Sequence, residues 1–251
     1  MTKAQPISVD NPAARPEELV ASNFVEDLLA AAKHNGLSED LALTILRRHD
    51  LQATVLEAVA RNHSVIKHRK VLIGLVEHQH TPRHVSLPLL RRLFTFELMQ
   101  VALAPSVLAD VKRVAEEVLV AKLGTLSLGE RITLARQGSA TVAGVLLLHS
   151  DMPVIEAALQ NPRMTEASIV KSLARPEVPV PLLNLLVEHS KWSIRREIQL
   201  GILRRKEAGD ALVLRVAAKL PKRALEQLLT QHKLPTSRRE LLQRALLQAR
   251  S

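Results

Sequence analysis

The chain has 251 residues, of which 47% are hydrophobic and 24% charged, and its formal net charge is +10. This length and apolar content suffice for a hydrophobic core and exclude a chain that is disordered throughout. Leu occurs 45 times, whereas there are 3 Phe, 1 Trp, 8 Gly and no Tyr. Because sheets draw on aromatic and β-branched residues and on glycine turns, this composition predicts an all-α protein.

The chain contains no Cys, which excludes disulfides, Cys-ligated zinc and iron–sulfur clusters. No apolar stretch follows Lys3, so the beginning of the chain does not resemble a secretory signal. No uncharged run approaches the roughly 18 residues that a membrane span requires. We therefore expect a cytoplasmic protein without a membrane span.

Residues 1–15 lack hydrophobic periodicity and are expected to form a flexible leader, ahead of a single domain over residues 16–251. Pro16, followed by two glutamates, is typical of a helix start. The capping box of Ser127 with Glu130 predicts a helix that stops at Gly138. The other expected N-cap residues are Ser38, Asp50, Ser106, Asp151 and Thr165. Together these signals predict roughly fourteen to sixteen short helices.

Internal repetition is indicated by three pairs of corresponding segments. The pairs are 55–62 with 154–161, 88–93 with 181–186, and 65–119 with 192–246. The third pair aligns without a gap and has seven identical positions, among them Gly74 with Gly201. Because a helical pair cannot cover its own apolar face, stacked pairs with a continuous core are expected. The sequence thus predicts an α-solenoid of short helical hairpins.

Two short runs carry a resemblance to a known family. Residues 161–165 (Asn-Pro-Arg-Met-Thr) and residues 192–196 (Trp-Ser-Ile-Arg-Arg) resemble degenerate repeats of bacterial HEAT-like and leucine-rich-repeat-variant proteins. The resemblance covers residues 38–249 and implies a right-handed α-solenoid that binds a macromolecule. Leucine-rich-repeat-variant proteins can carry a Cys-ligated iron–sulfur cluster, which this chain cannot hold. A resemblance at the level of the fold does not identify the macromolecule.

His78, His80 and His84 follow Glu77 closely, a combination of residues that zinc and nickel sites use. Thr81 and Pro82 are expected to separate two helices, which places these histidines in a connecting loop without the i, i+4 spacing of helical metal sites. We expect a solvated loop that titrates and no metal, with metal binding as the alternative.

No residue pattern points to catalysis or to a cofactor. Carboxylates that are neighbours in a helix, such as Glu116 and Glu117, point about 100° apart, and the chain has neither a nucleophile elbow nor a phosphate-binding glycine loop. Glu57 and Glu156 recur at one repeat position, which indicates a structural ion pair with the next repeat. We expect no catalytic residue, no cofactor and no enzymatic activity.

Positive charge is concentrated near the end of the chain. Residues 1–50 carry 5 Lys and Arg against 8 Asp and Glu, whereas residues 201–251 carry 12 against 4. A solenoid would stack basic clusters into a stripe that suits an acidic protein or a phosphate backbone; the alternative is that they complement helix dipoles. The candidate partner-binding residues are Lys67, Arg69, Lys70, Arg91, Arg92, Arg195, Arg196, Arg204, Arg205 and Lys206.

These features predict a non-enzymatic scaffold that binds an acidic protein, with duplex nucleic acid as the alternative partner. Single-strand recognition is disfavoured, because it uses stacking aromatic residues and the chain has few. Some HEAT-like solenoids are alkylpurine DNA glycosylases, and Trp192 beside Arg195 and Arg196 resembles such a site. One Trp and no Tyr cannot form the aromatic cradle, so we expect Trp192 to anchor helix packing. The basic helix at 237–250 suits the end of a helical stack, with a membrane surface as the alternative.

Overall fold

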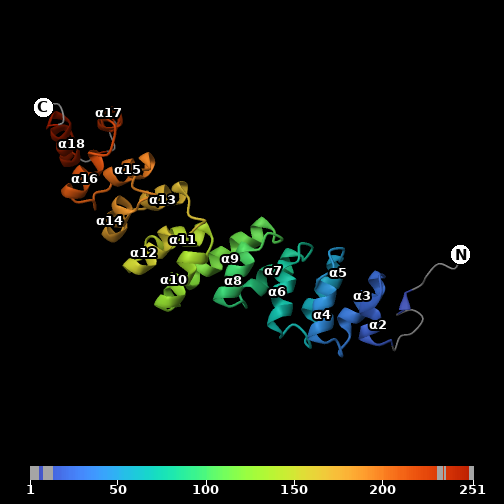
Figure 1. Cartoon of the computed structure of the whole chain (residues 1–251). Coiled ribbons are helices and arrows are strands. Elements are labelled where there is room, and N and C mark those ends of the chain that lie inside the picture. The colour runs from blue at the N-terminus through green and yellow to red at the C-terminus, as the bar shows by residue number, and fades with distance from the viewer. Residues whose placement is uncertain (1–5, 8–13, 231–233, 235, 249–251) are drawn as a thin grey trace. The chain divides into compact units, whose positions relative to one another are not determined.

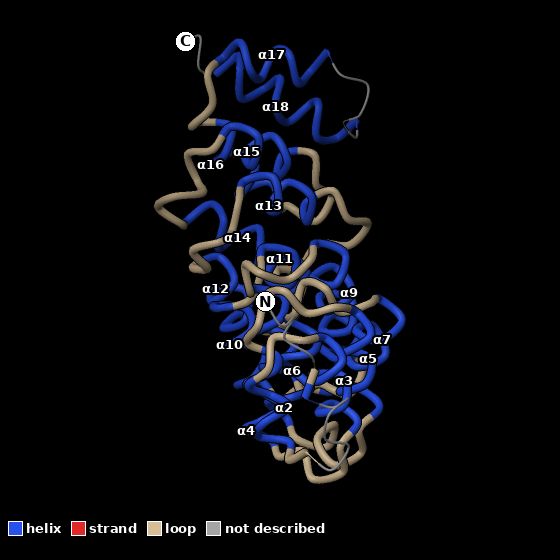
Figure 2. The backbone as a smooth tube through the Cα atoms, turned by 90° about the vertical axis from the view of Figure 1, so that its right-hand side faces the viewer, coloured by secondary structure: helices blue, strands red, loops and turns tan. Residues whose placement is uncertain are grey.

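The computed structural model describes residues 6–7, 14–230, 234 and 236–248, and this part of the chain is all-α. It contains seventeen α-helices, one short 3-10 helix and no strand (Figures 1 and 2). The all-α prediction is confirmed. The number of helices is slightly above the predicted fourteen to sixteen. The expected leader lies mostly outside the described residues.

The chain forms two compact units, Met1–Gly124 and Thr125–Ser251. The first contains α2 (Pro16–Ala21), α3 (Val25–Lys33), α4 (Glu39–Leu46), α5 (Ala53–Arg61), α6 (Arg69–Glu77), α7 (Arg83–Leu90), α8 (Thr95–Leu103) and α9 (Ala109–Lys122). The second contains α10 (Leu128–Gln137), α11 (Ala140–Leu146), α12 (Met152–Leu159), α13 (Glu166–Leu173), α14 (Val180–Glu188), α15 (Arg196–Leu203), α16 (Asp210–Ala217), α17 (Lys222–Thr230) and α18 (Thr236–Gln248). The 3-10 helix η1 is Leu123–Thr125. One continuous domain over residues 16–251 stays a prediction.

Within each unit, helices that are two apart in the chain pack against each other. In the first unit α3 packs on α5, α4 on α6 and α7 on α9; in the second α10 packs on α12, α11 on α13 and α13 on α15. The residues between them are fully buried and apolar, among them Ile45, Leu56 and Leu72 in the first unit and Leu134 and Leu146 in the second. Each unit therefore buries a core along a succession of short helices.

The two units repeat the same succession of helices with a register of 127 residues. Helices α3 to α9 begin at residues 25, 39, 53, 69, 83, 95 and 109, and helices α12 to α18 begin at 152, 166, 180, 196, 210, 222 and 236. The gap-free alignment of residues 65–119 on 192–246 has this same register and is confirmed. The structure extends the correspondence to residues 25–121 and 152–248.

Gly74 in the first unit and Gly201 in the second each face a leucine of a neighbouring helix at short distance. A Cβ atom added to Gly74 would lie 3.1 Å from Leu46 Cδ1, and one added to Gly201 would lie 2.9 Å from Leu173 Cδ1. The two leucines are also 127 residues apart. Glycine recurs here because α6 and α15 approach their neighbours too closely for a side chain.

Several expected helix caps are confirmed. The Ser38 hydroxyl accepts the Leu41 N–H at 3.3 Å, and the Thr165 hydroxyl accepts the Ser168 N–H at 3.1 Å. Ser127 forms the expected capping box with Glu130, and that helix ends at Gly138. Pro16 is the first residue of α2, as expected.

Two expected caps are wrong, and a third residue occupies the N-cap position without making the capping hydrogen bond. Helix α5 has Gln52 as its N-cap instead of Asp50, and α9 has Leu108 instead of Ser106. In both cases a buried apolar residue, Leu51 or Val107, follows the expected cap, and the chain brings it into the core before the helix starts. Asp151 is the N-cap of α12, but its side chain makes no capping hydrogen bond.

Candidate functional site

Two buried asparagines join helices that are about one repeat apart. The Asn62 amide donates to the Ala32 carbonyl at 2.8 Å and the His34 carbonyl at 3.0 Å. The Asn161 amide donates in the same way to the carbonyls of Ala135 and Gly138, at 2.8 and 3.0 Å. Each Oδ1 accepts the N–H of the residue two positions later. The repeated segments 55–62 and 154–161 thus share a structural role.

Four histidines at helix ends act as the same kind of acceptor. Their Nδ1 atoms accept the N–H two residues later, in the pairs His34 with Gly36, His78 with His80, His149 with Asp151 and His189 with Lys191. An acceptor Nδ1 requires a neutral ring. Burial lowers the pKa of His78 and His189, which favours the neutral form of these two rings. In the register of 127, His34 corresponds to Asn161 and His189 to Asn62.

The histidines considered for a metal site face backbone carbonyls or a carboxylate. His78 Nε2 lies 2.8 Å from the Arg48 carbonyl, and His80 Nδ1 lies 3.2 Å from the Leu51 carbonyl. The loop placement is confirmed for these two residues. It is wrong for His84, because α7 begins at Arg83, directly after Pro82. No group of three or more His, Asp and Glu side chains in the described part of the chain could hold a metal ion.

Glu57 contacts a histidine of the next repeat, at the position that its recurrence predicts, but its charged partner is an arginine of its own helix. Its Oε1 lies 3.4 Å from His84 Nε2 on α7, and its Oε2 lies 3.1 Å from Arg61 on its own helix. No such pair is present for Glu156 among the described residues.

In the first unit, the structure brings Arg69 and Arg92 together. Arg69 donates to the Arg92 carbonyl at 3.1 Å, and Arg92 donates to the Ile66 carbonyl at 3.4 Å. Arg69 also forms a two-point ion pair with Glu97, with Nε 3.0 Å from Oε1. The hydrogen bond from Arg69 holds the pKa of Glu97 below its usual range. Part of the predicted basic surface therefore stabilises the fold.

The other candidates in the first unit, Lys67, Lys70 and Arg91, are exposed. They lie in the α5–α6 and α7–α8 connections or at the adjoining helix end, as Arg69 and Arg92 do. The sequence prediction thus identifies one contiguous set of basic residues in this unit.

In the second unit, the five candidates lie at opposite ends of one helix. Arg195 and Arg196 lie at the start of α15, and the run 204–206 follows its end, about 12 Å away for eight residues. Arg205 is a structural residue: it donates to the carbonyls of Leu173, Arg175 and Pro176 at 3.2, 2.7 and 2.8 Å. It also pairs with Glu207 at 2.7 Å. Arg195, Arg196, Arg204 and Lys206 are exposed.

Trp192 is a packing residue, as predicted. Its side chain is buried, and its indole N–H donates to the Leu159 carbonyl at 3.1 Å. Leu159 corresponds to Ala32 in the register of 127, and the Ala32 carbonyl accepts the Asn62 amide. Two different side chains therefore bind the same carbonyl position in the two units.

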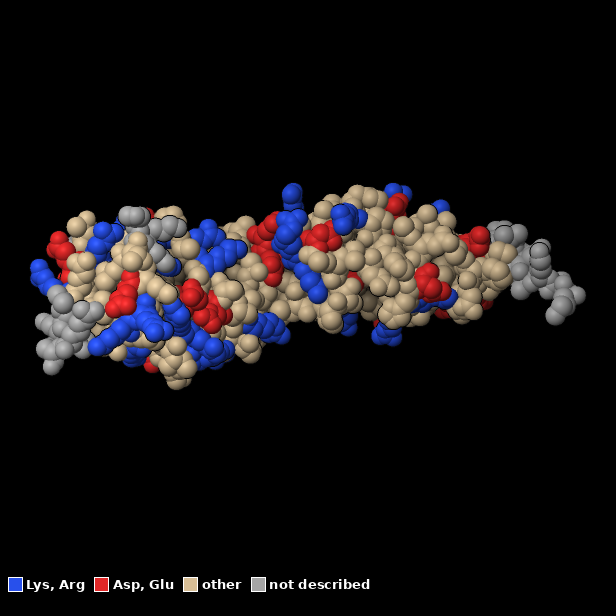
Figure 3. Space-filling view, turned by 90° about the horizontal axis from the view of Figure 1, so that it is seen from above, with Lys and Arg blue, Asp and Glu red and all other residues tan. Residues whose placement is uncertain are grey.

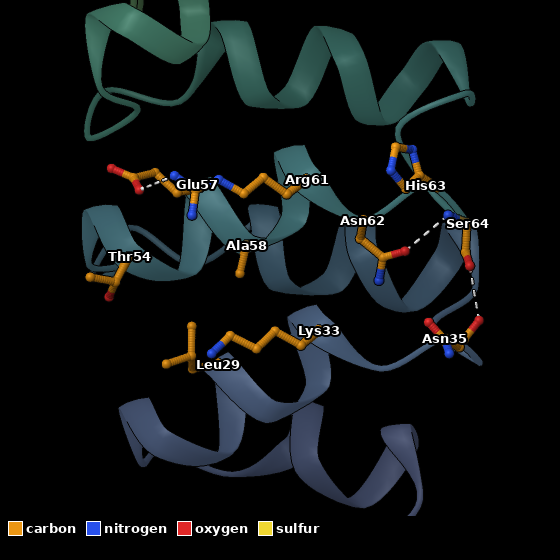
Figure 4. Close-up of a pocket in the computed structure, with 10 residues that line it drawn as sticks. All are labelled: Leu29, Lys33, Asn35, Thr54, Glu57, Ala58, Arg61, Asn62, His63 and Ser64. Atoms are coloured by element: carbon orange, nitrogen blue, oxygen red, sulfur yellow. Dashed lines mark hydrogen bonds and ion pairs between the residues drawn. The ribbon is translucent and has the colours of Figure 1, made fainter.

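A groove of about 440 Å³ lies between α3 and α5 (Figure 4). Leu29 and Ala58 form its apolar part, and Lys33 and Arg61 extend along it from the two helices. The carboxylate of Glu57 pairs with Arg61. The positive charge of Lys33 is therefore the one in the groove that Glu57 does not neutralise. The groove can accept a short chain with an anionic group beside Lys33. Sequence reasoning missed it because Lys33 and Arg61 are 28 residues apart, although α3 and α5 begin at residues that are separated by the same number.

The two units differ strongly in charge. The second carries 20 Lys and Arg against 11 Asp and Glu, a net of +9, and the first carries 15 against 14, a net of +1. On the face seen in Figure 3, basic side chains gather over the second unit, at the left of the view. Several neutral or acidic residues of the first unit have basic counterparts in the second, such as Gln79 with Lys206 and Thr44 with Lys171. The seven corresponding helices form in the first unit without this excess of positive charge, although Arg205 in the second unit does bind backbone carbonyls.

Comparisons with protein-family models, curated proteins and solved structures found no match for this chain. Among the described residues, no helix combines the length and apolarity needed to cross a bilayer. The functional conclusion therefore rests on the side chains described above.

Proposed function

We propose that this chain is a non-enzymatic, HEAT-like helical-repeat scaffold that binds an acidic macromolecule through its basic second unit. The observation that carries the proposal is the net charge of +9 on a helical frame that the first unit builds with +1. Charge beyond what a fold needs generates a field that attracts partners of opposite sign. The absence of Cys suits action in the cytoplasm.

The repeat architecture is supported by contacts that recur about one repeat apart. Side chains bind carbonyls 26 to 33 residues earlier, as from Asn161 to Ala135 and from Trp192 to Leu159. Stacked hairpins need such ties, because each hairpin contacts only its neighbours. We propose that they build a right-handed α-solenoid.

An acidic protein fits the second unit better than duplex nucleic acid does. Its candidate cations lie at both ends of α15, and the carboxylates of Glu197 and Glu207 lie among them. A duplex favours an uninterrupted basic track along its phosphates, whereas a protein can match interspersed charges of both signs.

The test is fluorescence anisotropy of the full chain with a labelled acidic peptide and with a duplex oligonucleotide, at about 50 and 200 mM salt. The variant Lys171→Glu with Lys206→Glu should weaken peptide binding about tenfold or more. The control Arg15→Glu with Arg47→Glu makes the same charge change on exposed residues of the first unit and should have a much smaller effect.

Equal losses in the two variants would contradict a partner surface on the second unit. Binding to the duplex that exceeds peptide binding and falls about a thousandfold between the two salt concentrations would instead favour the nucleic-acid alternative.

A further inference from the structure

Two of the three phenylalanines are exposed at one place in the first unit. Phe94 is 65% exposed and Phe96 is 44% exposed, at the start of α8. In the register of 127, Pro221 and Arg223 occupy the same positions at the start of α17. The helix start therefore does not need phenyl rings, and their exposure has no counterpart in the second unit.

The Phe94 ring is backed by a cation that is held in place. The guanidinium carbon of Arg69 lies 4.0 Å from the ring centroid, within the range of a cation–π contact. Arg69 is held by Glu97 and by the Arg92 carbonyl. Glu97 also accepts the Phe94 N–H at 2.7 Å. Both the ring's backbone and its cationic neighbour are thus fixed before any ligand binds.

The surroundings of this ring are strongly basic. We call Lys67, Arg69, Lys70, Arg91, Arg92 and Phe94 the aromatic–basic patch. The adjoining carboxylate of Glu97 is paired with Arg69, and the nearby Glu39 lies 3.1 Å from His68. Lys67, Lys70 and Arg91 are exposed and form no ion pair within the described residues. The patch therefore presents cations and an open aromatic face together.

We propose that the aromatic–basic patch binds single-stranded nucleic acid, with an unpaired base stacked on the open face of Phe94 and the flanking phosphates on Lys67, Lys70 and Arg91. This goes beyond the proposed function, which rests on the second unit. Single-strand binding combines exposed aromatic rings with cations along the backbone, and a duplex offers no free base face within its stack. The chain has few aromatic residues, but two of them, Phe94 and Phe96, are exposed beside these cations.

The proposal can be tested by anisotropy of the full chain with two labelled 12-mers, oligothymidylate and an abasic strand with the same number of phosphates. The wild type should bind oligothymidylate about tenfold more tightly, because stacking one base contributes on that order. Phe94→Ser places a residue that caps helices well at this N-cap position, and it should abolish the preference for oligothymidylate. Phe94→Trp should retain it.

Phe24→Ser is the matched control, because Phe24 is also an N-cap residue, of α3, and no arginine of the described part of the chain stacks on it. This variant should leave the preference unchanged. Far-UV circular dichroism shows whether each variant is folded. If Phe94→Ser unfolds, Phe94→Leu replaces it, and the loss of preference is again expected because leucine has no aromatic face.

Equal binding of the two strands by the wild type would overturn the proposal, as would a preference that survives in folded Phe94→Ser or Phe94→Leu. If oligoglutamate competes as well as oligothymidylate, the patch recognises negative charge alone, and this result would also overturn the proposal. The Lys171→Glu, Lys206→Glu variant should keep the preference. Its loss there would move single-strand binding to the second unit and overturn the assignment to this patch.

Discussion

Gly201 packs directly against Leu173, and a Cβ atom added to the glycine would lie 2.9 Å from Leu173 Cδ1 and 3.6 Å from Leu173 Cβ. Leu173 is only 2% exposed, so its side chain has little room to move away. Gly74 has the same relation to Leu46 in the first unit. The close packing of α13 with α15 therefore depends on the missing side chain.

Gly201→Ala should lower the free energy of unfolding by about 1 kcal/mol, because overpacking by one methyl costs about 1–3 kcal/mol and outweighs the helix propensity gained, at most about 1 kcal/mol. Gly144 in α11 is the control. A Cβ there would be 3.9 Å from its nearest neighbours, so Gly144→Ala should stabilise the protein by about 0.5–1 kcal/mol. Urea unfolding measures both changes, and equal stabilisation of the two variants would contradict the packing.

Asn161→Ala should cost about 2–3 kcal/mol of stability. The change leaves the carbonyls of Ala135 and Gly138 without their donor and the Arg163 N–H without its acceptor, in a place where Asn161 is 1% exposed. Asn184→Ala, at an exposed position on α14, should stay within about 0.5 kcal/mol of the wild type. Equal shifts of the urea midpoint in the two variants would contradict the stabilising role of the Asn161 hydrogen bonds between helices.

Stability should fall in mild acid through His78 and His189. Burial lowers the folded-state pKa of both, and nearby positive groups, His80 and Lys191, add to the effect. As the pH drops below the ordinary value of 6.5, the unfolded chain gains protons first. Their contribution is therefore complete above that pH and declines as the pH falls toward the lowered folded-state pKa.

His189→Asn tests this pH dependence, because Asn62 shows that an asparagine supplies the same acceptor at the corresponding position. Asparagine cannot be protonated in this range, so the loss of stability between about pH 7.5 and 5.5 should be smaller than in the wild type. Urea midpoints at the two pH values measure the difference. An unchanged loss would show that His189 does not contribute.

Arg205→Ala and Lys206→Ala should behave differently, although both residues are candidates from one basic run. Arg205 donates to three carbonyls and pairs with Glu207, so its removal should cost about 2–3 kcal/mol. Lys206 is exposed, and its removal should change stability by less than about 0.5 kcal/mol. Thermal unfolding of both variants checks this, and similar melting temperatures would contradict the structural role of Arg205.

The helices and their repetition were predictable because their signals are local. Ser38 and the Ser127–Glu130 box act on N–H groups within three residues, and the apolar spacing of residues 65–119 recurs at 192–246. Asp50 and Ser106 carried the same local signal and failed. Burial of Leu51 and Val107 decides where those two helices begin, and burial depends on neighbouring helices.

The candidate site was predicted only in part. The basic runs are visible in the sequence, but nothing in them distinguishes Arg205, which binds carbonyls, from the exposed Lys206. The number of aromatic residues likewise does not indicate that Phe94 is exposed and has Arg69 stacked on its other face. It also missed the histidines as neutral acceptors at helix ends. The signal for them was available: His189 stands where Asn62 stands in the register of 127.

The all-α class, the short helices and the 127-residue correspondence follow from the amino-acid sequence, because composition, capping and hydrophobic spacing act over a few residues. The packing of the helices settles which cations bind carbonyls, which cations face solvent, and which aromatic rings stay exposed. Those outcomes depend on groups about 30 residues apart, such as Arg205 with Arg175 and Arg69 with Glu97, which meet only when successive helices pack.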